Sequence, residues 1–95
     1  MTTQVEQLID VSDLEPPEPL VLTLHEAEAL PPGAWLRMRH RRHPCLLYDN
    51  LAQRGFSALT HSPGGEAVEV FIWRNDDAEA EEGARRAFEQ AELHP

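Results

Sequence analysis

Prolines divide the first part of this chain into short segments with different periodicities. Residues 8–11 form an apolar run that is typical of a strand. Residues 13–19 contain Pro16, Pro17 and Pro19, which exclude a strand and suit a bend that leads into the first turn of a helix. The apolar stripe that follows has helical spacing and consists of Leu20, Leu24, Ala27 and Leu30. Pro-Pro-Gly at 31–33 ends this predicted helix.

Residues 34–40 change the periodicity from helical to alternating. The core-facing set is Leu36, Met38 and His40, and the opposite set is Trp35, Arg37 and Arg39. This alternation predicts a half-buried strand. After the polar residues 41–43, Pro44 opens a second predicted helix, and Gly55 is a natural cap at its end. The apolar stripe of that helix is Leu47, Tyr48, Leu51 and Ala52.

The remaining residues predict a hairpin and a last helix. Residues 56–60 and 67–73 are typical of strands, and Ser-Pro-Gly-Gly at 62–65 is a hairpin turn signal. Residues 76–93 are rich in Ala and Glu and predict an acidic helix, in which Gly83 costs about 1 kcal/mol relative to Ala. The apolar stripe of this helix is Ala84, Ala87, Phe88 and Ala91.

The order β-α-β-α-β-β followed by a helix determines the expected fold class. Each β-α-β crossover is right-handed, so the first two helices are expected on one face of one sheet. The prediction is an α+β two-layer sandwich with a mixed four-stranded sheet, whose first two strands are parallel and whose last two form an antiparallel hairpin. Residues 1–74 are expected to form this α/β domain, and residues 75–95 an acidic helical tail.

The length and charge of the chain narrow the function classes. The 95 residues fit one domain, and no apolar run approaches the roughly 20 residues that a membrane span needs. Residues 1–6 lack the basic and apolar regions of a secretory signal, and Cys45, the single cysteine, cannot form an internal disulfide, so we expect a cytoplasmic protein. The net charge of −9 opposes binding to nucleic acid and to anionic membranes, and neither is expected as a partner.

The charges are segregated along the chain. The acids of residues 1–36, a segment without lysine or arginine, are Glu6, Asp10, Asp13, Glu15, Glu18, Glu26 and Glu28. The arginines of residues 37–74 are Arg37, Arg39, Arg41, Arg42, Arg54 and Arg74. We favour the interpretation that these arginines pair with the acidic flanks, and local binding of an anion is the alternative.

The segment between the first strand and the first helix resembles a known family. Leu-Glu-Pro-Pro-Glu-Pro at 14–19 is similar to the Leu-x-Cys-Pro-x-Pro signature of the TusA-like (SirA-like) sulfur-carrier superfamily, and Leu-Pro-Pro-Gly at 30–33 resembles its helix-ending turn. The resemblance spans about residues 8–74 and implies a TusA-like α/β domain whose functional edge is the one where the helices start. The sulfur-carrying cysteine of the family falls on Pro16, which has no nucleophile, so that family's persulfide chemistry is not expected there.

The chain resembles an uncharacterised branch of that superfamily more closely. This branch has Leu-Glu-Pro-Pro-Glu-Pro in place of the cysteine motif, and a His-x-Arg-x-Pro-x-x-Leu-Tyr segment after the second strand. The matching residues of the second segment are His40, Arg42, Pro44, Leu47 and Tyr48. The likeness implies no activity.

The expected site lies where the two helices begin. The C-terminal ends of parallel strands share one edge, and ligands of open α/β sheets bind outside those ends. The residues expected to converge there are Glu15, Glu18, His40, Arg42, His43 and Cys45. The predicted ligand-binding set is Glu15, Glu18, His40, Arg42 and Tyr48.

Metal binding is one chemistry open to this edge. His40, His43 and Cys45 offer ligands that suit zinc or another transition metal, with Glu15 or Glu18 as a fourth. The spacing His-x-x-His-x-Cys matches no standard zinc finger, and a loop with chance histidines is the alternative that we favour. His40 also lies in the core-facing register, where it can be a hydrogen-bonded structural residue.

Thiol chemistry and anion binding are the other two chemistries that are open to this edge. Cys45 at a helix start near Arg41 and Arg42 has neighbours that favour a thiolate, although packing as a small apolar residue is the interpretation that we favour. Two helix N-termini and Arg42 can hold a carboxylate or a phosphate. Glu15 and Glu18 oppose an anion at the first helix.

The function that we expect is a small non-catalytic binding or adaptor module. It would use the helix-start edge for a ligand or a metal, and the open sheet face for a protein partner or a homodimer. That face carries Trp35, Arg37, Arg39, Phe71 and Trp73 and needs a cover, which the tail helix or a second chain can supply. The alternative is a sulfur-transfer or redox role with Cys45 as the catalytic residue.

Overall fold

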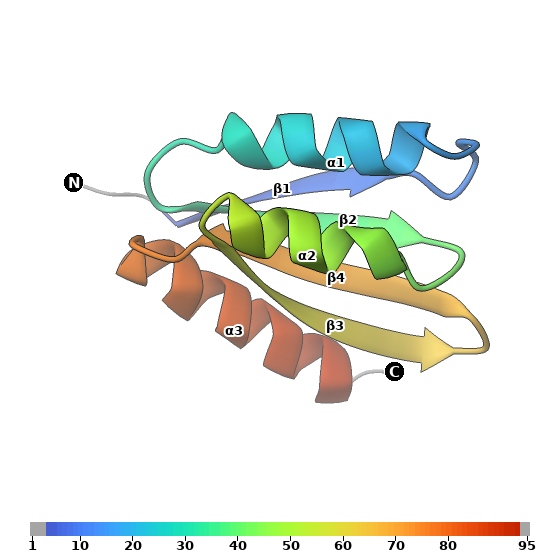
Figure 1. The fold of residues 1–95 in the computed structure, drawn as a ribbon. Helices are drawn as coiled ribbons and strands as arrows, with labels where there is room; N and C mark the ends of the chain where they lie inside the picture. The colour runs from blue at the N-terminus through green and yellow to red at the C-terminus, as the bar shows by residue number, and fades with distance from the viewer. Residues whose placement is uncertain (1–3, 94–95) are drawn as a thin grey trace.

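A four-stranded sheet with helices on both faces forms this protein (Figure 1). The computed structural model describes residues 4–93. Its elements are β1 (Val5–Asp10), α1 (Glu18–Glu28), β2 (Ala34–His40), α2 (Cys45–Gln53), β3 (Phe56–Gly64), β4 (Ala67–Arg74) and α3 (Ala78–Leu93). Residues 1–3, which belong to the segment where no secretory signal is expected, lie outside the described part of the chain. So do residues 94–95, the end of the expected helical tail. None of the helices in residues 4–93 has the length and apolar character needed to cross a membrane.

The sheet has the mixed topology that the sequence predicts. The strand order is β1-β2-β4-β3, with β1 parallel to β2 and both other pairings antiparallel. The strand β4 therefore lies between β2 and its own hairpin partner β3. Because β1 and β2 run in the same direction, they end at one edge of the sheet, where α1 and α2 follow them. The predicted fold class is confirmed.

The main core lies between the sheet and the adjacent helices α1 and α2 (Figure 1). The alternation of β2 directs Leu36 and Met38 to this side, where both are buried. Leu47 and Leu51 of α2 and Ala27 of α1 meet them from the helices. The two apolar stripes predicted from the sequence pack against the buried face of β2, except for Ala52, which is exposed.

The other sheet face is covered by α3, so it is not open to a partner in this structure. Trp35, Phe71 and Trp73 are buried there against Ala80 and Ala84 of α3. This corrects the expectation of an open sheet face for protein association. Of the two covers considered, the tail helix of the same chain is the one observed, because its stripe of small residues lets the helix lie close to the aromatic rings.

The close approach of α3 to the sheet depends on Gly83. A Cβ atom at this position would lie 2.3 Å from Cζ3 of Trp35, well inside van der Waals contact. The helix begins after Asp77, whose carboxylate accepts hydrogen bonds from the backbone N–H of Ala80 and of Gly33. Asp77 therefore both caps α3 and ties it to the turn before β2.

Several boundaries differ from the predicted ones, most of all the start of β1 and the end of β3. The strand β1 begins at Val5 rather than at residue 8, since its backbone pairs with β2 from Val5 onward. The strand β3 continues through Ser62 and Pro63 to Gly64, with an irregularity in register after His61, so the turn moves to residues 65–66. A proline is tolerated in an edge strand at such an irregularity, because no ladder hydrogen bond is needed from it there.

A cavity where two helices begin

The first turn of α1 and the loop before α2 enclose a cavity of about 230 Å³. It is lined by Pro16, Pro17, Pro19, Leu20, Met38, His40, Arg42, His43, Pro44, Cys45, Leu46 and Leu47. Two segments far apart in the sequence thus meet at the edge where β1 and β2 end. The structure brings His40, Arg42, His43 and Cys45 together around this cavity.

Prolines shape the walls of this cavity. The Pro16–Pro17 peptide bond is cis, Pro17 is the N-cap of α1, and Pro19 is a buried residue of its first turn. Pro44 occupies the N-cap position of α2. These rings can occupy helix starts because the first N–H groups of a helix have no intrahelical acceptor. They leave an apolar wall at a place where helix starts usually carry polar caps.

His40 is the polar residue most deeply set in the cavity wall. It is 9% exposed, and its Nδ1 accepts a hydrogen bond of 2.8 Å from the backbone N–H of Arg41. Burial, and then the positive charges of Arg42 and Arg41, hold the pKa of His40 below its usual 6.5, against a smaller opposing effect of Asp10. The ring is therefore neutral at pH 7, and its proton is on Nε2 because Nδ1 is the acceptor. Among residues 4–93 no side chain or backbone group bonds to Nε2.

The neighbouring arginines differ in their partners. Arg41 forms a loose ion pair with Glu15, with 3.8 Å between Nη2 and Oε1. Arg42 lines the cavity and forms no ion pair within the part of the chain that the structure describes. The guanidinium of Arg42 and the Nε2–H of His40 therefore remain available to an occupant, and the ring of His43 lines the same cavity.

The predicted metal set is not assembled. Within residues 4–93, no group of three or more His, Cys, Asp or Glu side chains is arranged to hold a metal ion. His40 directs Nδ1 to the backbone of Arg41, and the thiol of Cys45 is turned toward the carbonyl oxygen of His43 at 3.8 Å. The ligand set of His40, His43 and Cys45 thus fails on orientation, although all three residues line one cavity.

Three residues of the predicted ligand-binding set lie outside the cavity wall. Glu15 is directed to Arg41, and Glu18 lies on the outer side of α1 beside Val21. The hydroxyl of Tyr48 forms a hydrogen bond with Oγ1 of Thr60 on β3. No acidic side chain lines the cavity as a result.

The apolar part of the cavity wall was not predicted from the sequence. Leu20 and Leu47 belong to the predicted stripes, and Met38 shares the face of His40, so their periodicity assigned them to the core. Leu46 was passed over because it lies off the stripe of α2, where it is 73% exposed beside the cavity. An exposed leucine next to two histidines and a cysteine was the available signal.

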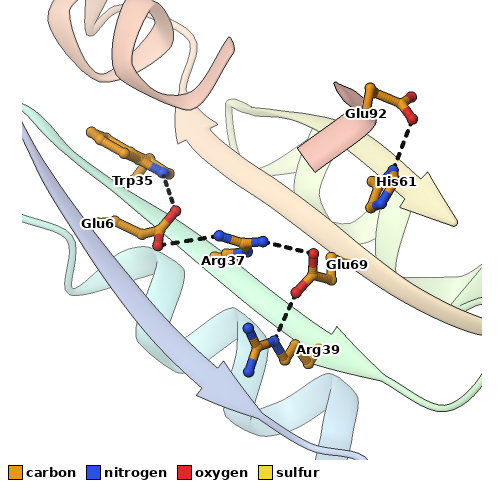
Figure 2. Close-up of polar contacts among 7 residues, drawn as sticks. All are labelled: Glu6, Trp35, Arg37, Arg39, His61, Glu69 and Glu92. Carbon is orange, nitrogen blue, oxygen red and sulfur yellow. Dashed lines mark hydrogen bonds and ion pairs between the residues drawn. The ribbon is translucent and has the colours of Figure 1, made fainter. Parts of the chain in front are cut away.

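Most arginines of the middle segment are neutralised by acids, in contrast to Arg42. Figure 2 shows Arg37 between Glu6 and Glu69, and Arg39 on the other oxygen of Glu69. The distances are 3.6 Å from Arg37 to Glu6, and 2.8 and 2.7 Å from Arg37 and Arg39 to Glu69. Glu6 also accepts a hydrogen bond from Nε1 of Trp35. We call these five residues, Glu6, Trp35, Arg37, Arg39 and Glu69, the arginine network.

The arginine network sets the protonation of Glu69. Burial alone would raise the pKa of Glu69, but the hydrogen bonds from Arg37 and Arg39 outweigh burial and hold it below its usual value. The expected pairing of the middle arginines with the acidic flanks is found with residues 1–36, through Glu6, Glu15 and Glu28, and not with the acidic helix α3. Glu81 and Glu82 pair with Arg85 and Arg86 on α3 itself. Glu92 pairs with the buried His61 (Figure 2).

Comparison with known families gives one match. The family described as "Uncharacterized conserved protein (DUF2249)" matches residues 8–74, which include both cavity-forming segments and the whole sheet except the start of β1. Neither the curated proteins nor the solved structures include a match to this chain. The segment of α3 lies beyond the matched residues.

Proposed function

The chain belongs to the DUF2249 family of uncharacterised conserved proteins, and we propose that it is a non-catalytic module that binds a small molecule in the cavity between α1 and α2. The observation that carries this proposal is His40, a nine-tenths buried ring in the cavity wall whose Nε2 bonds to no described residue and remains accessible to solvent. A bound ligand would accept the hydrogen bond from this N–H in place of water.

The composition of the cavity wall supports the same proposal. Small-molecule sites are concave and mostly apolar, with a few polar groups that orient the ligand. Here prolines, leucines and Met38 make the apolar wall, and His40 and Arg42 supply the polar groups. The volume of about 230 Å³ limits the occupant to a compound smaller than a typical drug.

The resemblance to TusA-like sulfur carriers forms part of the proposal. We propose that this chain shares their fold and has replaced their nucleophile by Pro16, whose ring lines the cavity. Proline offers neither a thiol nor a backbone N–H, so the position contributes shape and apolar surface only. This favours binding over catalysis at the start of α1.

A ligand screen with a blocked variant tests the proposal. Cys45→Trp places an indole in the cavity wall, and Ala52→Trp places the same group on an exposed position at the other end of α2. Ligand-observed NMR with a fragment library should find compounds that bind the wild type and Ala52→Trp and are lost in Cys45→Trp. Binding that persists in Cys45→Trp, or no binding at all, would overturn the proposal.

A sulfur-transfer role through Cys45 is the rival, because this exposed thiol lines the cavity. In that role a persulfide donor would pass its outer sulfur to Cys45, which leaves a Cys45 persulfide and the donor as a thiol. The thiol lies 3.8 Å from the carbonyl oxygen of His43. Mass spectrometry after incubation with a persulfide donor should show no sulfur adduct on Cys45. A stable adduct absent from Cys45→Ser would favour the rival.

A further inference from the structure

The geometry points to a small carboxylic acid with an apolar body as the ligand of this cavity, an inference that rests on the proposed function. Its carboxylate would accept hydrogen bonds from Nε2 of His40 and from the guanidinium of Arg42. Its hydrocarbon part would lie against Pro16, Leu20 and Leu46, apolar lining residues with exposed surface. Compounds of the size of benzoate or hexanoate fit this description.

Two of the polar side chains at the cavity, His40 and Arg42, are donors, and the ring of His43 and the thiol of Cys45 lie beside them. The neutral ring of His40 offers Nε2–H, and Arg42 offers N–H groups on a permanent positive charge. No Asp or Glu lines the cavity, although the chain has 17 acidic residues and a net charge of −9. A wall of this kind selects an occupant that accepts hydrogen bonds and carries negative charge.

The two helix starts at the cavity differ in a way that supports an anion. The first turn of α1 contains Glu18, whereas the first turn of α2 has no acid. The N-cap Pro44 makes no side-chain hydrogen bond to the backbone of α2. The positive end of this nine-residue helix therefore faces the cavity without a negative side chain beside it.

The apolar wall distinguishes a carboxylic acid from an inorganic anion. A phosphate ion has no surface that the prolines, Leu20 and Leu46 can bury, and its oxygens would lose hydration against them. A carboxylate attached to a hydrocarbon can bond to the donors of the wall and also cover its apolar side chains. Burial is the main cause of the lowered pKa of His40, and the positive charges of Arg42 and Arg41, which lower it further, would attract such a carboxylate.

The experiment compares matched probes on the whole chain at pH 7.5 and fixed ionic strength. Hexanoate and hexanamide have nearly the same size and differ in charge, and inorganic phosphate has charge without the hydrocarbon. Isothermal titration calorimetry should give a dissociation constant about tenfold lower for hexanoate than for hexanamide, and no competition from equimolar phosphate. Hexanoate, but not hexanamide, should raise the pKa of His40 in an NMR titration.

Variants assign the effect to the two donors. His40→Asn keeps an acceptor near the N–H of Arg41 and removes the donor at the Nε2 position, whereas His40→Gln places an amide N–H near that position. Arg42→Gln removes the charge from an exposed loop residue, and Arg85→Gln on α3 is its control. Affinity for hexanoate should fall about tenfold in His40→Asn and Arg42→Gln, less in His40→Gln, and not in Arg85→Gln.

The outcomes separate this inference from the proposed function. Equal affinity for hexanoate and hexanamide, both lost in Cys45→Trp, would overturn the carboxylate inference and leave the cavity as a ligand site. Unchanged hexanoate affinity in Arg42→Gln and His40→Asn would overturn it as well. If neither probe binds, the inference is wrong, and the fragment screen alone decides the proposed function.

Discussion

The arginine network and the cavity place the same types of residue in opposite situations. On the α3 side of the sheet, Arg37 and Arg39 share Glu69, and Arg37 also reaches Glu6 (Figure 2). At the cavity, Arg42 and Nε2 of His40 have no partner among residues 4–93. The strand β2 contributes to both regions, since it carries Arg37 and Arg39 of the network and ends at His40 of the cavity.

The difference between the two regions separates structural charge from charge that is available to a ligand. A salt bridge that is partly shielded from water holds strands together, and Glu69 does so between β2 and β4. Nε of Arg37 is buried without a partner among the described residues, but both terminal nitrogens of Arg37 are paired with acids. Arg42 and Nε2 of His40 are accessible to solvent and link no two elements of the described fold. We therefore attribute the arginine network to stability and the cavity groups to binding.

Glu69→Gln should have the largest effect on stability. It removes the charge shared by Arg37 and Arg39, where the side chain of Glu69 is only 13% exposed. We expect the free energy of unfolding at pH 7 to fall by roughly 1–3 kcal/mol in urea titrations, because charge-assisted hydrogen bonds between strands are weakened. Glu66→Gln in the exposed hairpin turn is the control and should change it by less than about 0.5 kcal/mol.

The effect of Glu69→Gln on the free energy of unfolding should depend on pH. Since the pKa of Glu69 is lower in the folded state than its usual 4.5, the folded state binds this proton less well than the unfolded state. The stabilisation is present above pH 4.5 and is lost as the pH falls through the folded-state value. The difference between wild type and Glu69→Gln should therefore shrink below pH 4.5. A difference that stays constant into acid would contradict the assignment.

Gly83→Ala should have the second largest effect. In an isolated helix the substitution would stabilise by about 1 kcal/mol, but its Cβ would meet the buried ring of Trp35. Overpacking of this kind costs roughly 1–3 kcal/mol, so we expect a net loss of roughly 1 kcal/mol together with altered tryptophan fluorescence. Gln90→Ala, at an exposed position of α3, should not destabilise. A more stable Gly83→Ala protein would show that α3 does not lie closely on this face.

Arg42→Gln should have the smallest effect on stability and a specific effect on His40. We expect the free energy of unfolding at pH 7 to change by less than about 0.5 kcal/mol, because Arg42 has no partner in the described fold. The pKa of His40 should rise toward 6.5, since one of the charges that lower it is removed. The wild type loses stability as the pH falls below 6.5 through the folded-state pKa of His40, and this loss should be smaller in the variant. An unchanged His40 titration in NMR would place Arg42 away from the cavity.

Periodicity was enough to predict the elements and their class. The alternation of β2 assigned Leu36, Met38 and His40 to the core side, and all three are buried. The prolines and glycines located the helix starts and ends, because their backbone limits act locally. The sequence also predicted that both helix starts share one edge, since this follows from a parallel pair of strands.

The pairing of strands distant in the chain, and the directions of side chains at the site, could not be predicted from the sequence. The position of β4 between β2 and β3 brings Glu69 opposite Arg39, and no local pattern reports this pairing. Glu15 and Glu18 belong to the right segment, but the turn into α1 directs them away from the cavity. Metal ligands depend on orientation, which residue spacing does not determine, and the described part of the chain does not orient His40, His43 and Cys45 toward a common centre.

Intermolecular NOE measurements with hexanoate on the wild-type chain would test the central claim, that the cavity is a ligand site, most directly. The account predicts NOEs from the hydrocarbon protons of hexanoate to the methyl groups of Leu20 and Leu46. It also predicts that these NOEs disappear in Cys45→Trp. NOEs to Trp73 or Phe88 on the α3 side instead, or the same NOEs in Cys45→Trp, would contradict it.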